Sequence, residues 1–172
     1  MITCSVQNSG IFNGVWIQKR PRITQYFGEN PQIYSKFKMK GHNGLDYGVP
    51  VGTKVFAPMD GIVKVKDSGV QGYGLHVKIR NSFKAAEMVV AHLSRASVAS
   101  GGKVNAGDLI GYSGNTGFST GPHVHEGFRL LKPTDGDIYT WPVLNYENGY
   151  LGYIDYIDWV VTWKGTLVQN TL

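Results

Sequence analysis

The residue types and spacing needed for metal chemistry occur in residues 121–125, whose sequence is G-P-H-V-H. In a strand, side chains at positions i and i+2 point to the same face, so His123 and His125 would lie side by side. One imidazole could then bind a metal ion while the other faces whatever the ion holds. Residues 111–121 are rich in glycine, serine and threonine, and such a loop leaves room around a site. Taken alone, an H-x-H pair is also typical of two surface histidines. Other residues of the chain must therefore show whether this pair belongs to a metal site.

A second pair of candidate ligands lies earlier in the chain, where His42 precedes Asp46 by four residues. On an extended chain these positions share a face, so both side chains can reach one ion. Together with His125 they provide three nitrogen or oxygen ligands of the kind that zinc accepts. Three protein ligands leave one position open for water, which is typical of catalytic zinc. We therefore expect one zinc ion per chain, which lowers the pKa of its bound water to about 7 and polarises a substrate carbonyl.

Two further histidines, His92 and His123, are the candidate catalytic residues. Neutral imidazoles beside a zinc-bound water can take its proton or stabilise a developing oxyanion. His92 ends an apolar strand, which would present it at a cleft. The fifth histidine, His76, shares the polar face of an alternating segment with Lys78 and Arg80, so we expect it to be solvated and dispensable.

The elements that position these side chains are predicted to be short strands, because glycine is frequent, at 23 residues, and helical periodicity is scarce. We expect a mostly β fold in which an antiparallel sheet forms a compact half-barrel with a duplicated motif, few short helices and a groove that holds the metal. The duplication is suggested by two similar phrases, V-x-A-P-x-x-G at 55–61 and V-x-A-G at 104–107. The expected elements are strands at 15–18, 53–57, 62–66, 73–80, 88–92, 109–112 and 123–130, and a helical turn at 93–99.

Bulk composition limits the classes of protein to which the chain can belong. With 172 residues, of which 42% are hydrophobic and 17% charged, it is long enough for one soluble domain. Its single cysteine, Cys4, excludes an internal disulfide and a cysteine-based metal site. No run of about 18 apolar residues is present, so we expect no membrane span. The net charge is +5, but the basic residues are scattered and no nucleic-acid-binding motif is present.

Three segments carry a resemblance to a known family: G-H-N-G-L-D at 41–46, A-H-L-S at 91–94 and S-G-N-T-G-F-S-T-G-P-H-V-H at 113–125. In this order and at these separations they resemble the lysostaphin-like (LytM-type) zinc metallopeptidases. That family cuts the peptide part of bacterial peptidoglycan. The resemblance runs over residues 22–130 and resumes at 151–160.

The resemblance implies roles for particular residues by their position. It places the zinc ligands at His42, Asp46 and His125, in agreement with their chemistry. It places the two catalytic histidines that do not bind zinc at His92 and His123. The implied activity is a zinc-dependent endopeptidase that hydrolyses the stem peptide or cross-bridge of peptidoglycan, with the zinc-bound water as nucleophile.

The expected organisation is an N-terminal arm at 1–20, a metallopeptidase domain at 21–165 with an inserted loop at 131–150, and a tail at 166–172. We expect a monomer that acts on peptidoglycan outside the cell or in the periplasm, with no nucleic-acid partner. Residues 1–10 lack the pattern of a signal peptide, so either the signal was removed or export uses another route. A short enzyme of this kind would suit a phage lysin or a virion component.

One departure from the family pattern follows the H-x-H pair, where the chain continues with Glu126. Simple alternation places Glu126 on the apolar face with Val124 and Phe128, whereas a bulge at Gly127 would turn it away. The aromatic residues of segment 139–163 could stack on sugars or pack on the sheet, and packing is the favoured interpretation.

Two other classes of protein share parts of this pattern. Biotinyl and lipoyl carrier domains have a related half-barrel, but they need a lysine between its halves, and the F-K-M-K sequence at 37–40 precedes the first half. Some relatives of the peptidases have lost their ligands and only activate other wall enzymes as binding modules. All the functional positions of the family are occupied in this chain, which favours the enzyme.

Overall fold

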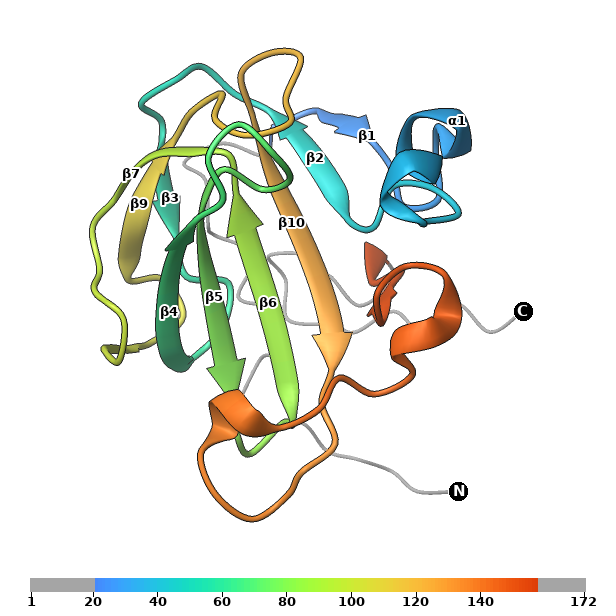
Figure 1. Ribbon diagram of the computed structural model, residues 1–172. Helices are drawn as coiled ribbons and strands as arrows, with labels where there is room; N and C mark the ends of the chain where they lie inside the picture. The colour runs from blue at the N-terminus through green and yellow to red at the C-terminus, as the bar shows by residue number, and fades with distance from the viewer. Residues whose placement is uncertain (1–20, 158–172) are drawn as a thin grey trace, which may run out of the picture.

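The structure, a computed structural model that describes residues 21–157, is built around two antiparallel sheets (Figure 1). The predicted mostly β, antiparallel fold is confirmed. The expected arm at 1–20, its strand at 15–18 and the tail at 166–172 lie outside the described residues.

The larger sheet has eight strands, and β10 lies near its centre between β2 and β6. The strand order is β1-β2-β10-β6-β5-β4-β8, and β11 also pairs with β10. The bounds are β1 (Ile23–Gln25), β2 (Leu45–Gly48), β4 (Gly61–Asp67), β5 (Leu75–Asn81), β6 (Ala86–Ala91), β8 (Lys103–Val104), β10 (His123–Leu130) and β11 (Tyr153–Ile154).

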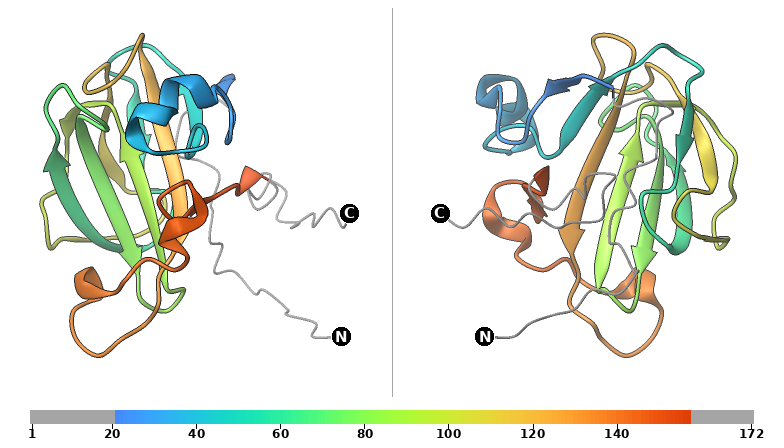
Figure 2. Two further views of the ribbon diagram at one scale, coloured as in Figure 1. Left: turned by 45° about the vertical axis from the view of Figure 1, so that its right-hand side comes forward. Right: turned by 180° about the vertical axis from the view of Figure 1, so that it is seen from behind.

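The smaller sheet has three strands in the order β3-β9-β7 and packs on one face of the larger sheet (Figure 2). Between the two sheets lies a fully buried apolar core, to which Val55 and Ile110 contribute from the smaller sheet and Val77 and Met88 from the larger. The predicted alternation, with the apolar residues of β5 facing the core, is confirmed. The bounds are β3 (Lys54–Phe56), β7 (Leu93–Ala96) and β9 (Leu109–Ser113).

The two similar sequence phrases lie side by side. Gly61 pairs with Val104 where β4 meets β8, and the Gly107 amide donates a hydrogen bond to the Ala57 carbonyl (2.9 Å). The two motifs, residues 55–61 and 104–107, therefore connect the two sheets at one edge of the core.

In the described part of the chain, helical structure is limited to single turns. Segment 131–150, coloured orange in Figure 1, contains two of them and one isolated bridge, from Leu131 to Val143. Within residues 21–157, no helix is long and apolar enough to cross a membrane. The turns are α1 (Pro31–Tyr34), η1 (Ser35–Phe37), η2 (Ile138–Thr140) and η3 (Tyr146–Asn148).

The helical turn predicted at 93–99 is wrong, because this segment begins with strand β7. β7 pairs with β9, with Arg95 opposite Tyr112 and Ala96 opposite Gly111. Leu93 is buried in the core while Arg95 is exposed. Tertiary pairing therefore overrides the helical preference of a short segment that contains leucine, arginine and alanine.

The prediction that His76 is solvated, on the polar face that it shares with Arg80, is also wrong. They lie on the outer face of the larger sheet, away from the smaller one, but they are only 3% and 8% exposed. Arg80 is covered by segment 138–141, to which its Nη1 atom donates a hydrogen bond at the Ile138 carbonyl (2.6 Å). Alternation showed which face these residues occupy, but not that distant segments cover that face.

Glu87 is the centre of a buried cluster of charges on this outer face. Its Oε1 atom accepts from Arg129 Nε (2.8 Å) and lies 3.7 Å from Lys78 Nζ, and its Oε2 atom accepts from Arg80 Nε (2.5 Å). Arg129 Nη1 also donates to the Leu151 carbonyl (3.1 Å). The cluster therefore attaches segment 138–151 to the sheet through both arginines.

β10 continues without a bulge, because its register with β6 is regular from His125 to Leu130. Glu126 therefore faces the core, at 1% exposure, and accepts a hydrogen bond from the Tyr156 hydroxyl (2.8 Å), so simple alternation is the correct alternative. Burial raises the pKa of Glu126 to about 8, although the bond from Tyr156 opposes this, so the carboxyl group is protonated at neutral pH. Core packing is confirmed for Tyr153 and Tyr156, both 1% exposed, whereas residues 158–163 lie outside the described range.

Substitution of Glu87 should strongly destabilise the fold. In Glu87→Gln, Lys78, Arg80 and Arg129 lose the anion that they share, and breaking a buried ion pair costs about 3–5 kcal/mol in free energy of unfolding. The exposed Glu147→Gln is the control and should change this quantity by less than about 0.5 kcal/mol. Equal stability of the two variants in urea denaturation would show that the cluster has no stabilising role.

The same variant has a predicted pH dependence. Burial favours the protonated form of Glu87, but Arg129, Lys78 and Arg80 outweigh it and hold the pKa of Glu87 below its usual value. The stabilisation is therefore present above the pKa of an unfolded glutamate and is lost as the pH falls through the lower, folded-state pKa. The stabilities of Glu87→Gln and the unsubstituted protein should converge in acid.

Candidate metal centre

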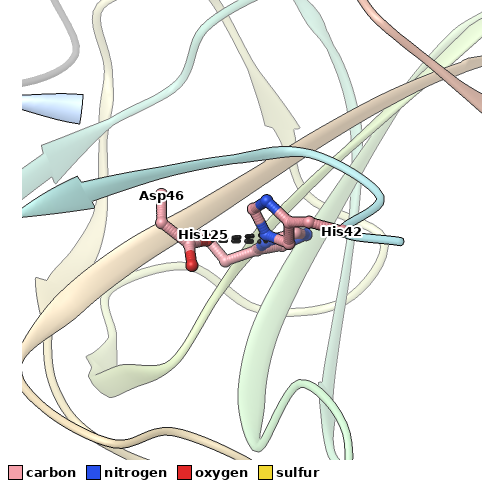
Figure 3. A group of neighbouring side chains, drawn as sticks. All are labelled: His42, Asp46 and His125. Atoms are coloured by element: carbon pink, nitrogen blue, oxygen red, sulfur yellow. Dashed lines mark hydrogen bonds and ion pairs between the residues drawn. The ribbon is translucent and has the colours of Figure 1, made fainter. Parts of the chain in front are cut away.

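The centre is built where β2 pairs with β10, because their register sets Asp46 directly opposite His125. His42 precedes β2 and points back to the same place (Figure 3). Asp46 Oδ1 lies 3.0 Å from His42 Nε2 and 2.9 Å from His125 Nδ1, and the two nitrogens are 2.9 Å apart. The three predicted ligands are thus brought together, and all three are buried.

The donor atoms fit a metal ion such as zinc. Ligand atoms about 2.0–2.1 Å from a tetrahedral zinc ion lie about 3.3 Å from one another, close to the spacing seen in this triangle. His42 Nδ1 lies 3.0 Å from the Tyr26 carbonyl, so it carries the proton and His42 Nε2 presents a lone pair. This lone pair and a carboxylate oxygen therefore converge on one point, where a cation would satisfy both.

The protonation states also suit metal binding. Burial raises the pKa of Asp46, but the adjacent His125 and His42 outweigh it and hold this pKa well below its usual range. Burial lowers the pKa of His125, although Asp46 opposes the shift. An ionised carboxylate and a neutral imidazole are the forms that bind metals.

Gly44 allows the segment between His42 and Asp46 to cross β10 closely. A Cβ atom at this position would lie 2.2 Å from the Glu126 carbonyl oxygen and 2.7 Å from His125 Cε1. Both distances are shorter than van der Waals contact, so only glycine fits without displacing the ligand.

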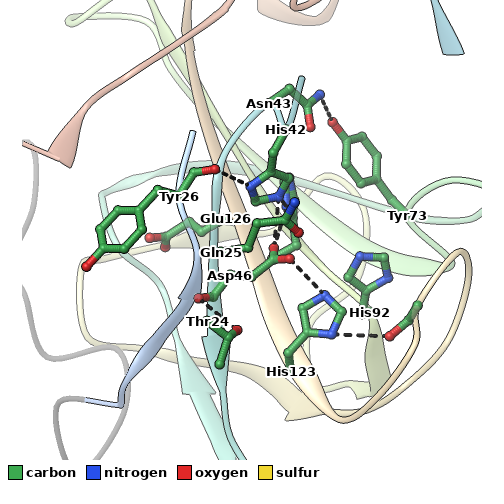
Figure 4. A network of polar contacts seen from close by, with 12 residues as sticks. Thr24, Gln25, Tyr26, His42, Asn43, Asp46, Tyr73, His92, His123 and Glu126 are labelled. Atoms are coloured by element: carbon green, nitrogen blue, oxygen red, sulfur yellow. Dashed lines mark hydrogen bonds and ion pairs between the residues drawn. The ribbon is translucent and has the colours of Figure 1, made fainter. Parts of the chain in front are cut away.

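The two predicted catalytic histidines lie beside this group (Figure 4). The His92 ring centroid is 4.5 Å from that of His123 and 6.0 Å from that of His125. His123 Nε2 lies 3.5 Å from Asp46 Oδ2, and its Nδ1 lies 2.8 Å from the Gly121 carbonyl. The structure therefore brings the predicted catalytic pair and the predicted ligand group into one site.

His92 is held in an unusual backbone conformation directly after β6. Its φ angle of 60° is in the left-handed region, which costs free energy for a residue other than glycine. Its Nδ1 atom donates to the Thr116 carbonyl (2.7 Å), so the lone pair is on Nε2. Burial, followed by the charges of His125 and His123, lowers the pKa of His92 to about 3, so the ring is neutral at neutral pH.

Three residues that the sequence analysis did not identify position these histidines. The Tyr73 ring stacks on His125, with centroids 5.2 Å apart, and Asn43 Nδ2 donates to the Tyr73 hydroxyl (2.7 Å). Thr116 holds His92, as described above, and its hydroxyl donates to the Leu93 carbonyl (2.9 Å). The only signals in the sequence are indirect, since Asn43 and Thr116 lie inside the family-like segments and Tyr73 lies between two glycines.

His76 is not part of the histidine group. Its Nδ1 atom bonds to the Gly74 carbonyl (2.8 Å), and its ring lies 5.5 Å from the Tyr73 ring. Burial lowers the pKa of His76, so it is a neutral, buried side chain rather than a solvated one.

An antiparallel β fold with a buried His–Asp–His group and two histidines beside it is the architecture of a metallohydrolase. Comparison with known proteins gives the family: the profile of peptidase family M23 matches residues 40–136. The chain belongs to peptidase family M23, and the predicted family resemblance is confirmed.

Three relatives illustrate the similarity. An uncharacterized metalloprotease of Haemophilus influenzae is 36% identical over 114 residues, which cover 66% of this chain and 24% of that protein. The peptidoglycan DD-endopeptidase ShyC of Vibrio cholerae is 43% identical over 93 residues, which cover 54% of this chain and 21% of that protein. This chain therefore spans about a quarter or less of the length of each of these two relatives. The crystallised catalytic domain of a variant of the prophage-encoded M23 protein EnpA from Enterococcus faecalis has a TM-score of 0.55 and 32% identity, covering 73% of this chain and 88% of that one.

Substitution of Gly44 tests the close contact between the segment that carries His42 and Asp46 and strand β10. Gly44→Ala should lower the free energy of unfolding by about 1–3 kcal/mol or more, because the added methyl group overlaps the Glu126 carbonyl and His125. Gly121→Ala is the matched control, since a Cβ atom there would have nothing within 4 Å. If both variants unfolded at the same urea concentration as the unsubstituted protein, the packing described here would be wrong.

Proposed function

We propose that this chain is a zinc-dependent endopeptidase that hydrolyses peptide bonds in bacterial peptidoglycan. The observation that carries the proposal is the convergence of His42 Nε2, Asp46 Oδ1 and His125 Nδ1 within 3.0 Å of one another, with two more histidines alongside. Membership of peptidase family M23 supports the reaction class. The substrate is supported by relatives such as ShyC, a peptidoglycan DD-endopeptidase.

Three side chains would hold the zinc ion. His42 would bind through Nε2 and His125 through Nδ1, and Asp46 would bind through Oδ1. When bound, zinc lowers the pKa of a coordinated water and polarises the carbonyl that is attacked. The Tyr26 carbonyl fixes the proton of His42 on Nδ1, which keeps Nε2 available as a ligand.

His92 and His123 would handle protons and charge at the scissile bond. Since His92 Nδ1 is committed to the Thr116 carbonyl, His92 Nε2 is the atom that can accept a proton and return it to the leaving amine. His123 lies against His92 and within 3.5 Å of Asp46, so it can hydrogen-bond the same reacting group. Either imidazole can take the proton or stabilise the oxyanion, and the pair divides these two tasks.

The proposal also includes the compartment in which the chain acts and its oligomeric state. Its substrate lies in the cell wall, so we propose that it acts in the periplasm or outside the cell, as a monomer, with a peptidase domain at 21–165. Release of new peptide ends from purified peptidoglycan, identified by mass spectrometry, tests the activity. A module that only binds the wall would associate with the polymer and release no new ends.

Removal of any ligand should remove metal and activity together. His42→Ala, Asp46→Ala and His125→Ala should each contain much less than one zinc per chain by elemental analysis and release no peptides. Full zinc occupancy in His125→Ala would contradict the proposed ligand set.

Removal of a catalytic histidine should separate binding from chemistry. His92→Ala and His123→Ala should keep their zinc but lose turnover by about 10²–10⁴-fold, the usual contribution of a general acid or base. The turnover of the double variant should fall by less than the product of the two single fold-reductions, because both residues act on one transition state. Loss of zinc from His123→Ala to the same extent as from His125→Ala would make His123 a ligand instead.

A further inference from the structure

We propose that Tyr73 is a positioning residue that orients His125 in the metal centre through ring stacking. It would replace the hydrogen-bond acceptor that a metal-binding histidine usually has. The inference rests on the proposed metal centre and adds a residue that the family-like sequence segments do not contain.

His125 lacks the usual second contact. Its Nδ1 atom points to Asp46 and His42, so Nε2 is the nitrogen that faces away from the proposed ion. Metal-binding histidines almost always donate this other N–H to a carboxylate, carbonyl or water, which fixes the orientation of the ring. In His125 the Nε2 atom is buried and has no hydrogen-bond partner within residues 21–157. No protein group of residues 21–157 therefore holds the ring through this nitrogen, which leaves the contacts of the ring face to orient it.

The Tyr73 ring is the flat surface against which His125 lies. The two planes are 28° apart at a centroid distance of 5.2 Å, which is an offset-stacked arrangement. The other two neighbouring rings, His42 and His92, meet His125 edge-on at 66° and 72°. Tyr73 therefore restricts rotation of His125 about χ2, the movement that would turn Nδ1 away from the ion.

Tyr73 is itself fixed by contacts to the other parts of the site. Its hydroxyl accepts from Asn43, the residue after His42, and is hydrogen-bonded to the Tyr153 hydroxyl. Its carbonyl accepts from the His92 amide (3.1 Å). One residue thus contacts the segments that carry His42, His92 and His125.

The turn that carries Tyr73 has little room to move. Gly72 and Gly74, on either side, have φ angles of 55° and 56°, in the region that favours glycine. A Cβ atom on Gly74 would lie 2.5 Å from the Gly117 amide nitrogen. The turn is therefore packed directly on the loop whose Thr116 holds His92.

The hydroxyl of Tyr73 is not available for the reaction, because Asn43 and Tyr153 both bind it. This is why Tyr73 is a positioning residue and not a catalytic one. The prediction is that the ring matters for metal binding while the hydroxyl matters little.

The test compares Tyr73→Leu, which removes the ring, with Tyr73→Phe, which keeps it. Zinc affinity is measured on the full chain by competition with a chromophoric chelator, and the visible absorption spectrum of the cobalt(II) form reports the coordination geometry. Tyr73→Leu should weaken zinc binding by about 10–100-fold, the usual effect of losing such a supporting contact, and should change the cobalt spectrum. Tyr73→Phe should retain both properties. Tyr139→Leu is the matched control, because it removes a partly buried tyrosine ring that packs over Arg80, in the other polar region of the outer face.

Several outcomes would overturn the inference. Unchanged zinc affinity and an unchanged cobalt spectrum in Tyr73→Leu would show that the stack does not orient His125. A loss of zinc affinity in Tyr73→Phe as large as that in Tyr73→Leu would show the same. An equal loss of zinc affinity in Tyr139→Leu would indicate a general effect of stability. If the unsubstituted protein bound no metal, the proposed function itself would fail, which is a distinguishable result.

A measurement on the unsubstituted protein covers the case in which Tyr73→Leu does not fold. The His125 ring protons should resonate upfield of those of an exposed histidine in the NMR spectrum, because the Tyr73 ring current shields them. Resonances at ordinary positions would contradict the stacking and overturn the inference without any substitution.

Discussion

The pairing register of β2 and β10 is the constraint on which the site depends. It sets Asp46 opposite His125, and therefore determines which side chains of β10 face the proposed ion. Because side chains alternate along a strand, a shift by one residue would turn His125 into the core and bring Glu126 to the site. The register is fixed from both sides: Phe128 packs into the core on one face, and Arg129 pairs with Glu87 on the other.

The outer face of the larger sheet has two polar regions with different roles. At one end, Glu87 is matched by Lys78, Arg80 and Arg129, so the buried charges are paired within the protein. At the other end, the nitrogens of His42 and His125 and an oxygen of Asp46 converge on one point. Tyr153 lies between the two regions, since its ring contacts both the Arg129 guanidinium and Tyr73. The charges of the first region are therefore paired within the protein, whereas the second gathers donor atoms that could hold a cation.

Alternation in the sequence predicted most of the strands, because it is a property of a single strand. The grouping of five polar residues joins distant segments, and it was predicted from ligand chemistry together with the resemblance of three segments to a known family. The ring that stacks on His125 and the ions around Glu87 could not be predicted in this way, since both depend on contacts between distant segments. The burial of His76 was missed for the same reason. The helical turn expected at 93–99 was wrong because pairing with β9 determines the conformation of that segment. The alternatives for Glu126 were resolved only by the regular register of β10.

The most direct test of this account is anomalous X-ray diffraction at the zinc edge from crystals of the zinc-loaded protein. One anomalous peak per chain is expected, about 2.0–2.2 Å from His42 Nε2, Asp46 Oδ1 and His125 Nδ1, with His92 and His123 outside bonding distance. A peak bonded to His123, or one that is remote from the β2–β10 pair, would contradict it.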